Sequence, residues 1–328
     1  MNTTIERSSS LKEQFLSDIL EGLQAEPKFM QAKYFYDEQG DYIFQQIMEM
    51  ESYYLTNAEM EILATQSGSI ADQIALANTE FDLIELGAGD ATKSIHLLKE
   101  LTNRKLDFTY FPIDISAHVI ADLEQRLPTQ IPNLKITGLH GDYFEMLKRT
   151  ATESGRRKVL LFMGANIGNM SIEEAEAFCA ELKSTLSAGD MLIIGFDLKK
   201  NPKQILAAYD DPAGITSDFN INLLARINKE LNGDFNLKNF EHYASYDPQS
   251  GACKSYLISL TDQEVHVGPY ATVHFSKNEY IFMEISQKYA LKEIEKLAEK
   301  TGFKIQKHFF DGNKYFVDTM WIVEQQTT

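Results

Sequence analysis

Residues 81–98 read FDLIELGAGDATKSIHLL, and this stretch decides the fold. An apolar run ends at Leu86, a GAGD turn follows, and apolar residues recur at helical spacing from Ile95. Strand, glycine turn and amphipathic helix are the opening unit of an α/β fold. The glycines let the backbone approach a ligand closely, although a tight turn without a ligand explains them equally well. The third glycine of the dinucleotide fingerprint is missing, which disfavours a dinucleotide.

The same rhythm continues along the chain. Apolar runs predict strands at 106–114, 134–139, 159–163 and 191–197, and helical spacing predicts helices at 116–127 and 171–186. Ser171, with Glu174 three residues later, is a capping-box signal for the second helix. Alternating strands and helices predict a doubly wound, mostly parallel sheet of the Rossmann-like kind. Its ligand is expected beyond the carboxyl ends of the strands.

Two stretches break this rhythm. The first runs to about residue 57 and is helical but rich in tyrosine, and the second, 198–284, combines a long helical region with alternating strand-like segments. After them, a helix over 292–301 stops at Gly302, and segments 303–310 and 316–323 predict a closing hairpin. We therefore predict a core domain of residues 59–197 and 287–328, interrupted by a second, α+β domain of residues 1–58 and 198–286.

Composition narrows the class of protein. With 328 residues, 44% of them hydrophobic, the chain is long enough for one large or two ordinary globular domains. The 31 basic against 48 acidic residues give a net charge of -17, which repels a phosphate backbone and disfavours nucleic acid as a partner. No apolar run reaches the roughly 18–20 residues that span a bilayer. The N-terminus lacks a signal-peptide core. We expect a cytoplasmic monomer with no membrane partner.

Cysteine usage argues against a disulfide framework or a zinc ribbon. Cys179 and Cys253 are the only cysteines, lie far apart, and neither belongs to a CxxC pair. The sequence thus predicts no metal site.

Polar residues follow two further strands of the predicted sheet. Asp114 ends the strand after the glycine turn, where it can accept two hydrogen bonds from a ribose diol or cap the next helix. Asp142 and Tyr143, in the sequence Gly-Asp-Tyr, suit an adenine edge contact and ring stacking, or form a plain surface turn. The conjunction of glycine turn, acid and Asp-Tyr pair at successive strand ends favours S-adenosylmethionine over a dinucleotide.

Three other segments carry polar side chains without a decisive pattern. The loop MGANIGNM, residues 163–170, places Asn169 where it could meet a substrate amine or cap a helix, although Ser171 already supplies that cap. Residues 209–220 form a loop whose role the pattern does not define. In MEIS, residues 283–286, strand alternation sends Glu284 and Ser286 to one face, which is most often the solvent face.

Taken together, these stretches resemble the histidine-specific, S-adenosylmethionine-dependent methyltransferase family, which makes trimethylhistidine (hercynine) in ergothioneine biosynthesis. Related members methylate tryptophan-derived amines. The motifs that carry the resemblance span nearly the whole chain: KYFYDEQGDYIFQQI (33–47), ESYYLTNAEMEIL (51–63), ELGAGDATKS (85–94), PIDIS (112–116), GDYFE (141–145), FMGANIGNM (162–170), AYDDPAGITSDFNINLLARIN (208–228) and MEISQKY (283–289). The 208–228 block is the most specific of them.

The resemblance implies a donor site in the core domain. By position, Gly87 and Lys93 would contact the methionine part of the methyl donor, Asp114 its ribose, and Asp142 and Tyr143 its adenine.

The resemblance also implies an acceptor site, which makes the second domain the substrate-binding domain. The α-carboxylate and α-amine of the amino acid would be held by Tyr53, Asn169 and Tyr209. Two residues, Asn169 and Tyr36, would lie at the reacting amine. Glu284 and Ser286 would hydrogen-bond the imidazole ring. The implied activity is Nα-methylation of L-histidine, in three successive transfers.

One position departs from the family pattern. Histidine-methylating members usually carry a methionine beside the imidazole site, and Ser255 stands there in this chain. The departure leaves room for a methyltransferase of the same fold that acts on another amino acid, such as tryptophan or arginine. A non-catalytic protein that binds S-adenosylmethionine or an amino acid is the alternative from another class.

Overall fold

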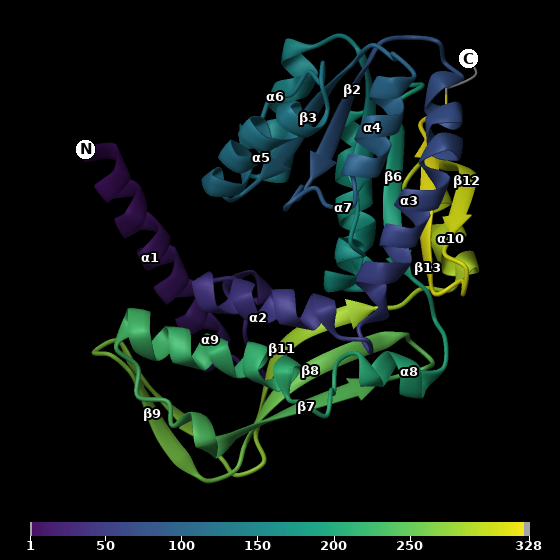
Figure 1. Ribbon diagram of the computed structural model, residues 1–328. Coiled ribbons are helices and arrows are strands. Elements are labelled where there is room, and N and C mark those ends of the chain that lie inside the picture. The colour runs from purple at the N-terminus through teal and green to yellow at the C-terminus, as the bar shows by residue number, and fades with distance from the viewer. Residues whose placement is uncertain (1, 325–328) are drawn as a thin grey trace. The chain divides into compact units, whose positions relative to one another are not determined.

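The computed structural model describes residues 2–324 (Figure 1). The chain divides into two compact units, which we call the core unit (Leu55–Lys199 and Gln287–Thr328) and the second unit (Met1–Tyr54 and Lys200–Ser286). The sequence placed the corresponding boundaries at 58/59, 197/198 and 286/287. No helix among residues 2–324 is long and apolar enough to cross a membrane.

The core unit is built on a seven-stranded sheet with the strand order β12-β13-β6-β5-β2-β3-β4. Strands β2 to β6 pair in parallel, as the α/β rhythm predicted. The strands are β2 (Phe81–Leu86), β3 (Phe108–Asp114), β4 (Leu139–His140), β5 (Arg157–Phe162), β6 (Met191–Asp197), β12 (Lys304–Phe310) and β13 (Phe316–Ile322). The helices are α3 (Tyr54–Ala75), α4 (Ile95–Asn103), α5 (Ala117–Gln130), α6 (Tyr143–Glu153), α7 (Ile172–Thr185) and α10 (Leu291–Lys300), with a 3-10 turn η2 (Asn166–Asn169).

Burial explains why the central strands form where they do. Every residue of β2 and of β6 is buried, because helices cover both faces of a parallel sheet. The predicted capping box of α7 is present: Ser171 accepts a hydrogen bond from the Glu174 N–H, and the Glu174 side chain accepts one from the Ser171 N–H. Gly302, with φ +82°, ends α10 as predicted.

The chain ends with the predicted hairpin. Strands β12 and β13, yellow in Figure 1, are antiparallel to each other, and β13 lies antiparallel against β6. The single tryptophan, Trp321, is fully buried there and stacks on Phe196 with 5.9 Å between ring centroids. The last segment of the chain thus completes the sheet that the first half began.

The predicted strand at 134–139 is wrong in extent. Only Leu139 and His140 form a strand, and Ile136 makes an isolated bridge to Tyr110. The Gly138 N–H donates to the Glu124 carboxylate instead of to a neighbouring strand. This segment is the edge of the sheet, where one side has no strand to pair with, so apolar alternation alone did not form a ladder.

The second unit holds a four-stranded sheet of order β1-β11-β8-β7 and a two-stranded ribbon, β10-β9. Helices α2 and α9 run along the sheet (Figure 1). Its strands are β1 (Lys28–Phe29), β7 (Phe240–Tyr246), β8 (Ala252–Ser259), β9 (Gln263–Val267), β10 (Ala271–Phe275) and β11 (Tyr280–Gln287). Its helices are α1 (Asn2–Gln24), α2 (Glu38–Glu49), α8 (Pro202–Ala207) and α9 (Ile215–Leu231), with 3-10 turns η1 (Ala32–Tyr34) and η3 (Leu237–Asn239).

The second unit has an apolar core of its own. Phe219, Leu223 and Ile227 of α9 lie three to four residues apart and pack with Leu257 of β8 and Met283 of β11. A helix stripe buried against one face of a sheet is the standard way to close such a layer.

Candidate functional site

The glycine turn after β2 lies against a ring hydroxyl. Gly87 has φ +72°, a conformation that favours glycine, and a Cβ atom there would lie 2.6 Å from the Tyr143 hydroxyl oxygen. The amide nitrogen of Asn166 would be 3.8 Å from the same Cβ. The turn thus needs glycine both for its backbone angle and for the space that the neighbouring side chains leave. Asn166 lies in the quoted 162–170 motif, but no pattern in the sequence singled it out.

Asp114 holds the turn and the next helix together. Its Oδ2 accepts a hydrogen bond from the Gly89 N–H at 3.2 Å, and its Oδ1 accepts one from the Ser116 N–H at 2.9 Å. Ser116 itself caps α5. Asp114 therefore lies beside the glycine turn at the carboxyl end of β3, which is the position that the sequence predicted for it.

Asp142 and Tyr143 begin α6. Asp142 accepts hydrogen bonds from the N–H groups of Phe144 and Glu145, so it is the N-cap of that helix. Burial, and then the charges of Asp114 and Asp142, raise the pKa of Tyr143 to about 12. The Tyr143 phenol therefore stays protonated at neutral pH and can act as a hydrogen-bond donor.

Lys93 and the loop after β5 lie on the same side of the turn. A Cβ at Gly164 would be 3.7 Å from the Lys93 ammonium and 3.5 Å from the Asn166 amide nitrogen. Asn169 ends η2, the turn that this loop leads into. Ala165 has φ +56°, a left-handed conformation that costs an alanine about 1–2 kcal/mol. Such local strain is tolerated where the surrounding structure fixes the loop, and it is common at binding sites.

In the second unit, residues predicted to bind the amino acid come together. The Tyr209 hydroxyl and the Ser286 hydroxyl share a hydrogen bond of 2.8 Å, and the rings of Tyr53 and Tyr209 lie 6.1 Å apart between centroids. Phe44 connects this group to Tyr36, with centroid distances of 6.5 Å to Tyr53 and 5.5 Å to Tyr36. Tyr36, Tyr53 and Tyr209 are thus members of one aromatic cluster.

Glu284 has a neighbour that sequence analysis missed. The amide nitrogen of Asn220, a fully buried residue of α9, lies 3.5 Å from Glu284 Oε1 and 3.0 Å from the Thr216 carbonyl oxygen. The Asn220 Oδ1 atom has no hydrogen-bond partner among residues 2–324. The predicted loop at 209–220 is wrong from Ile215 on, where α9 begins, so Asn220 is a helix residue. Only the fold places it beside the strand that carries Glu284.

Ser255, the position that departs from the family pattern, is buried in β8 with 1% of its surface exposed. Strand β8 is the direct neighbour of β11, which carries Glu284 and Ser286. Among residues 2–324, no three His, Cys, Asp or Glu side chains lie together so that they could hold a metal ion.

The core unit belongs to the class of doubly wound α/β proteins whose glycine turn and following acid suit a nucleoside. The family model for histidine-specific, S-adenosylmethionine-dependent methyltransferases matches residues 15–323, and the chain belongs to this family.

Named relatives support the assignment. The chain is 34% identical over 304 residues to a histidine N-alpha-methyltransferase of Mycolicibacterium smegmatis, covering 92% of each chain. It is 35% identical over 273 residues to a protein of the same name from Mycobacterium tuberculosis, covering 83% of each. It is also 31% identical over 276 residues to ergothioneine biosynthesis protein 1 of Schizosaccharomyces pombe, covering 82% of this chain and 36% of that one.

Proposed function

We propose that the protein transfers methyl groups from S-adenosylmethionine to the α-amine of L-histidine, and that three transfers give trimethylhistidine. The observation that carries the proposal is the hydrogen bond between the Tyr209 and Ser286 hydroxyls. Glu284, on the same strand as Ser286, adds a carboxylate. These groups offer an amino acid both hydroxyls and a negative charge. Family membership supplies the donor and the reaction class.

The donor is held in the core unit. Lys93 provides a cation for the donor's carboxylate, Asp114 provides acceptors for its ribose hydroxyls, and Asp142 and Tyr143 flank the adenine. Gly87 leaves the backbone open to close approach, since a Cβ there would collide with the Tyr143 hydroxyl. The described residues fit the donor because cation, acid and open turn lie at the carboxyl ends of adjacent strands.

The acceptor is held by hydroxyls, amides and one carboxylate. Tyr53, Tyr209 and Asn169 bind the α-carboxylate and α-amine. Glu284 accepts a hydrogen bond from a ring N–H of the imidazole, and Ser286 bonds the ring as well. A hydrogen bond to a charged partner contributes about 1.5–3 kcal/mol.

Methyl transfer is an in-line displacement at carbon. The new N–CH3 bond forms as the S–CH3 bond breaks, the sulfonium becomes a neutral thioether, and the positive charge passes to nitrogen. The amine must be neutral when it attacks, so the ammonium first loses a proton to water, and each further transfer again needs a free lone pair. The residues contribute by orientation, Asn169 and the tyrosines holding the amine in line with the methyl carbon.

Three transfers also require that the growing cation be tolerated. Tyr36, Tyr53 and Tyr209 present aromatic rings, and a quaternary ammonium near a ring face is stabilised by cation–π attraction.

The decisive experiment is a panel of the twenty amino acids with S-adenosylmethionine, read by mass spectrometry. Histidine is expected to gain three methyl groups. Methylation of tryptophan or arginine in preference to histidine would favour the alternative that Ser255 raises, and no transfer to any amino acid would favour a non-catalytic binding protein. A product that stops at one methyl group would contradict the three-transfer proposal alone.

Removing the imidazole acceptor gives a direct test of ring recognition. Glu284→Ala is expected to raise the KM for histidine by about one to two decades, because a charge-assisted hydrogen bond is lost. Donor affinity, measured by calorimetry without amino acid, should stay within about twofold, since Glu284 belongs to the second unit. An unchanged KM would remove Glu284 from the ring site.

A further inference from the structure

Glu59 has a carboxylate in an unusual position. It lies on α3, but 0% of its side chain is exposed. A carboxylate taken out of water needs close partners, and Glu59 has two. Its Oε1 accepts a hydrogen bond from the Gly164 N–H at 2.6 Å, and its Oε2 forms an ion pair with the Lys93 ammonium. Both partners belong to segments that the proposed function uses.

The sheet makes room for this carboxylate. A Cβ at Gly195 in β6 would lie 2.6 Å from Glu59 Oε1 and 3.0 Å from the ring of Phe316. Any larger residue at Gly195 would therefore displace the Glu59 carboxylate. Gly195 on β6 therefore leaves the space that the carboxylate of Glu59 on α3 occupies.

The charge opposite Lys93 belongs to Glu59. Asp318, which pairs with Gly195 across the sheet, is also fully buried, and its carboxyl oxygens have no hydrogen-bond partner among residues 2–324. Burial, followed by the charge of Glu59, raises the pKa of Asp318 well above its usual value, which favours the protonated form of this acid. Of these two acids, Glu59 is the one whose carboxylate pairs directly with the Lys93 ammonium.

Lys93 is reachable where Glu59 is not. The Lys93 side chain keeps 28% of its surface exposed. Burial by itself would lower the pKa of Lys93, but the charge and hydrogen bond of Glu59, together with the charges of Asp318 and Glu85, outweigh it. The pKa is therefore raised and the ammonium stays charged. A ligand can therefore meet Lys93, whereas Glu59 can influence a ligand only through Lys93 and through the backbone of Gly164.

We propose that Glu59 is a positioning residue for the methyl donor. It fixes the Lys93 ammonium and the start of the Gly164–Asn169 loop in one geometry, so that the donor's carboxylate meets an oriented cation. The inference rests on the proposed donor role of Lys93. It assigns to α3 a part in donor binding, although Glu59 carried no role within the quoted 51–63 motif.

Calorimetric titration of the full chain with S-adenosylmethionine, without amino acid, tests the proposal. Glu59→Gln keeps the shape of the side chain and an acceptor for the Gly164 N–H, but removes the charge that pairs with Lys93. The donor Kd is expected to rise about tenfold. The matched control is Glu61→Gln on the same helix: its Oε1 also accepts a backbone N–H, that of Gly312 at 2.9 Å, and the Kd should stay within about twofold.

A double-mutant cycle separates positioning from general structural damage. In a Lys93→Met background, Glu59→Gln is expected to weaken donor binding by less than about twofold more, because its effect passes through Lys93. A further tenfold loss in that background would overturn the proposal, as would an unchanged Kd in Glu59→Gln alone. If Glu59→Gln does not yield folded protein, Gly195→Ala displaces the same carboxylate, and an unchanged Kd there would equally overturn it.

These outcomes are independent of the acceptor. Donor binding is measured with no amino acid present, so a loss in Glu59→Gln together with no transfer to histidine would contradict the proposed activity and leave the role of Glu59 intact. If the protein methylates histidine but Glu59→Gln leaves the donor Kd unchanged, the proposed activity stands and the role of Glu59 is contradicted.

Discussion

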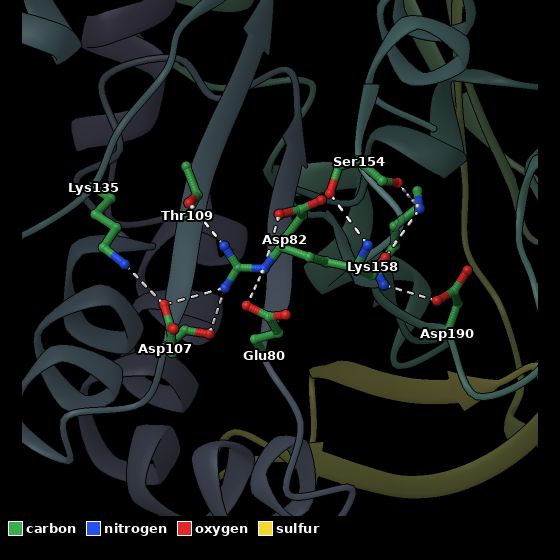
Figure 2. Close-up of polar contacts among 9 residues, drawn as sticks. Glu80, Asp82, Asp107, Thr109, Lys135, Ser154, Lys158 and Asp190 are labelled. Atoms are coloured by element: carbon green, nitrogen blue, oxygen red, sulfur yellow. Dashed lines mark hydrogen bonds and ion pairs between the residues drawn. The ribbon is translucent and has the colours of Figure 1, made fainter. Parts of the chain in front are cut away.

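At the amino ends of β2, β3 and β5, charged side chains share several partners and most of them are exposed, whereas at the carboxyl ends of the same sheet Glu59 and Glu85 are buried and have few partners. Figure 2 shows Glu80, Asp82 and Asp107 gathered at the amino ends. Arg156 lies between them, 3.4 Å from Glu80, 3.7 Å from Asp82 and 3.3 Å from Asp107. At the other end, Glu59 is fully buried and pairs with Lys93.

The two ends shift carboxyl pKa values in opposite directions. At the amino end, the hydrogen bond from Lys135 lowers the pKa of the exposed Asp107. At the carboxyl end, burial raises the pKa of Glu85 to about 7, against the opposing effect of the Tyr110 hydrogen bond. Pairing dominates where water is near, and desolvation dominates where it is excluded. The amino end is thus arranged for stability, and the carboxyl end keeps glycine-lined space and a reachable cation for a ligand.

The largest effect is expected from Asp114→Ala at the carboxyl end. Loss of two acceptors for the ribose should weaken donor binding by about 100-fold or more, measured by calorimetry. The control is Asp90→Ala in the same turn, because the Asp90 side chain accepts a local hydrogen bond from the Thr92 N–H. Retained affinity in Asp114→Ala would refute the ribose assignment.

The second-largest effect on donor binding is expected from Gly87→Ala. The added Cβ would lie 2.6 Å from the Tyr143 hydroxyl at φ +72°, so the turn must shift, and donor affinity should fall about tenfold. Adding Tyr143→Phe removes the colliding hydroxyl and should restore part of the loss. If the double variant binds no better than Gly87→Ala alone, the hydroxyl contact is not what limits the turn.

A change at the amino end should affect stability and leave binding alone. Arg156→Met leaves Asp82, whose side chain is 2% exposed, without its cation, and should lower the free energy of unfolding by about 1–3 kcal/mol. Denaturant titration measures this. Arg149→Met, which breaks an exposed helix pair with Glu153, is the control and should cost under about 0.5 kcal/mol. If Arg156→Met also raised the donor Kd, the contrast between the two ends of the sheet would be wrong.

The smallest effect is a pH dependence from Glu85. Its pKa is about 7 in the folded protein against 4.5 ordinarily, so between these values the unfolded chain has lost a proton that the folded chain keeps. The contribution to stability is therefore complete below about pH 4.5 and is lost as the pH rises through 7. Relative to Glu85→Gln, the protein should lose about 1 kcal/mol of unfolding free energy between pH 6 and 7. Glu80→Gln, an exposed acid, should leave that dependence unchanged.

Much of the core unit could be predicted from local pattern. Strand β6 is apolar up to its last residue, Asp197, and the capping box at Ser171 involves only residues within three positions of one another. The strand at 134–139 could not be predicted in its full extent, because alternation specifies which side chains are buried but not whether every backbone group pairs with the neighbouring strand. Here the Gly138 N–H donates to the Glu124 carboxylate.

The site divides in the same way. Asp114 and the glycine turn are local features at strand ends, so their position on the sheet followed from the rhythm of the elements. Glu59 and Asn220 lie in quoted motifs, but the sequence assigned neither of them a role. Their importance comes from Lys93 and Gly164, 34 and 105 residues away from Glu59, and from Glu284, 64 residues away from Asn220.

The sequence by itself determined the fold class, the family and the residues expected to meet donor and amino acid, because periodicity and motifs are properties of neighbouring residues. Only the tertiary structure decided that Glu59 is buried, that Gly195 makes room for it, and that the charge facing Lys93 comes from α3. Burial and long-range pairing depend on which surfaces the fold brings together, and no local pattern encodes them.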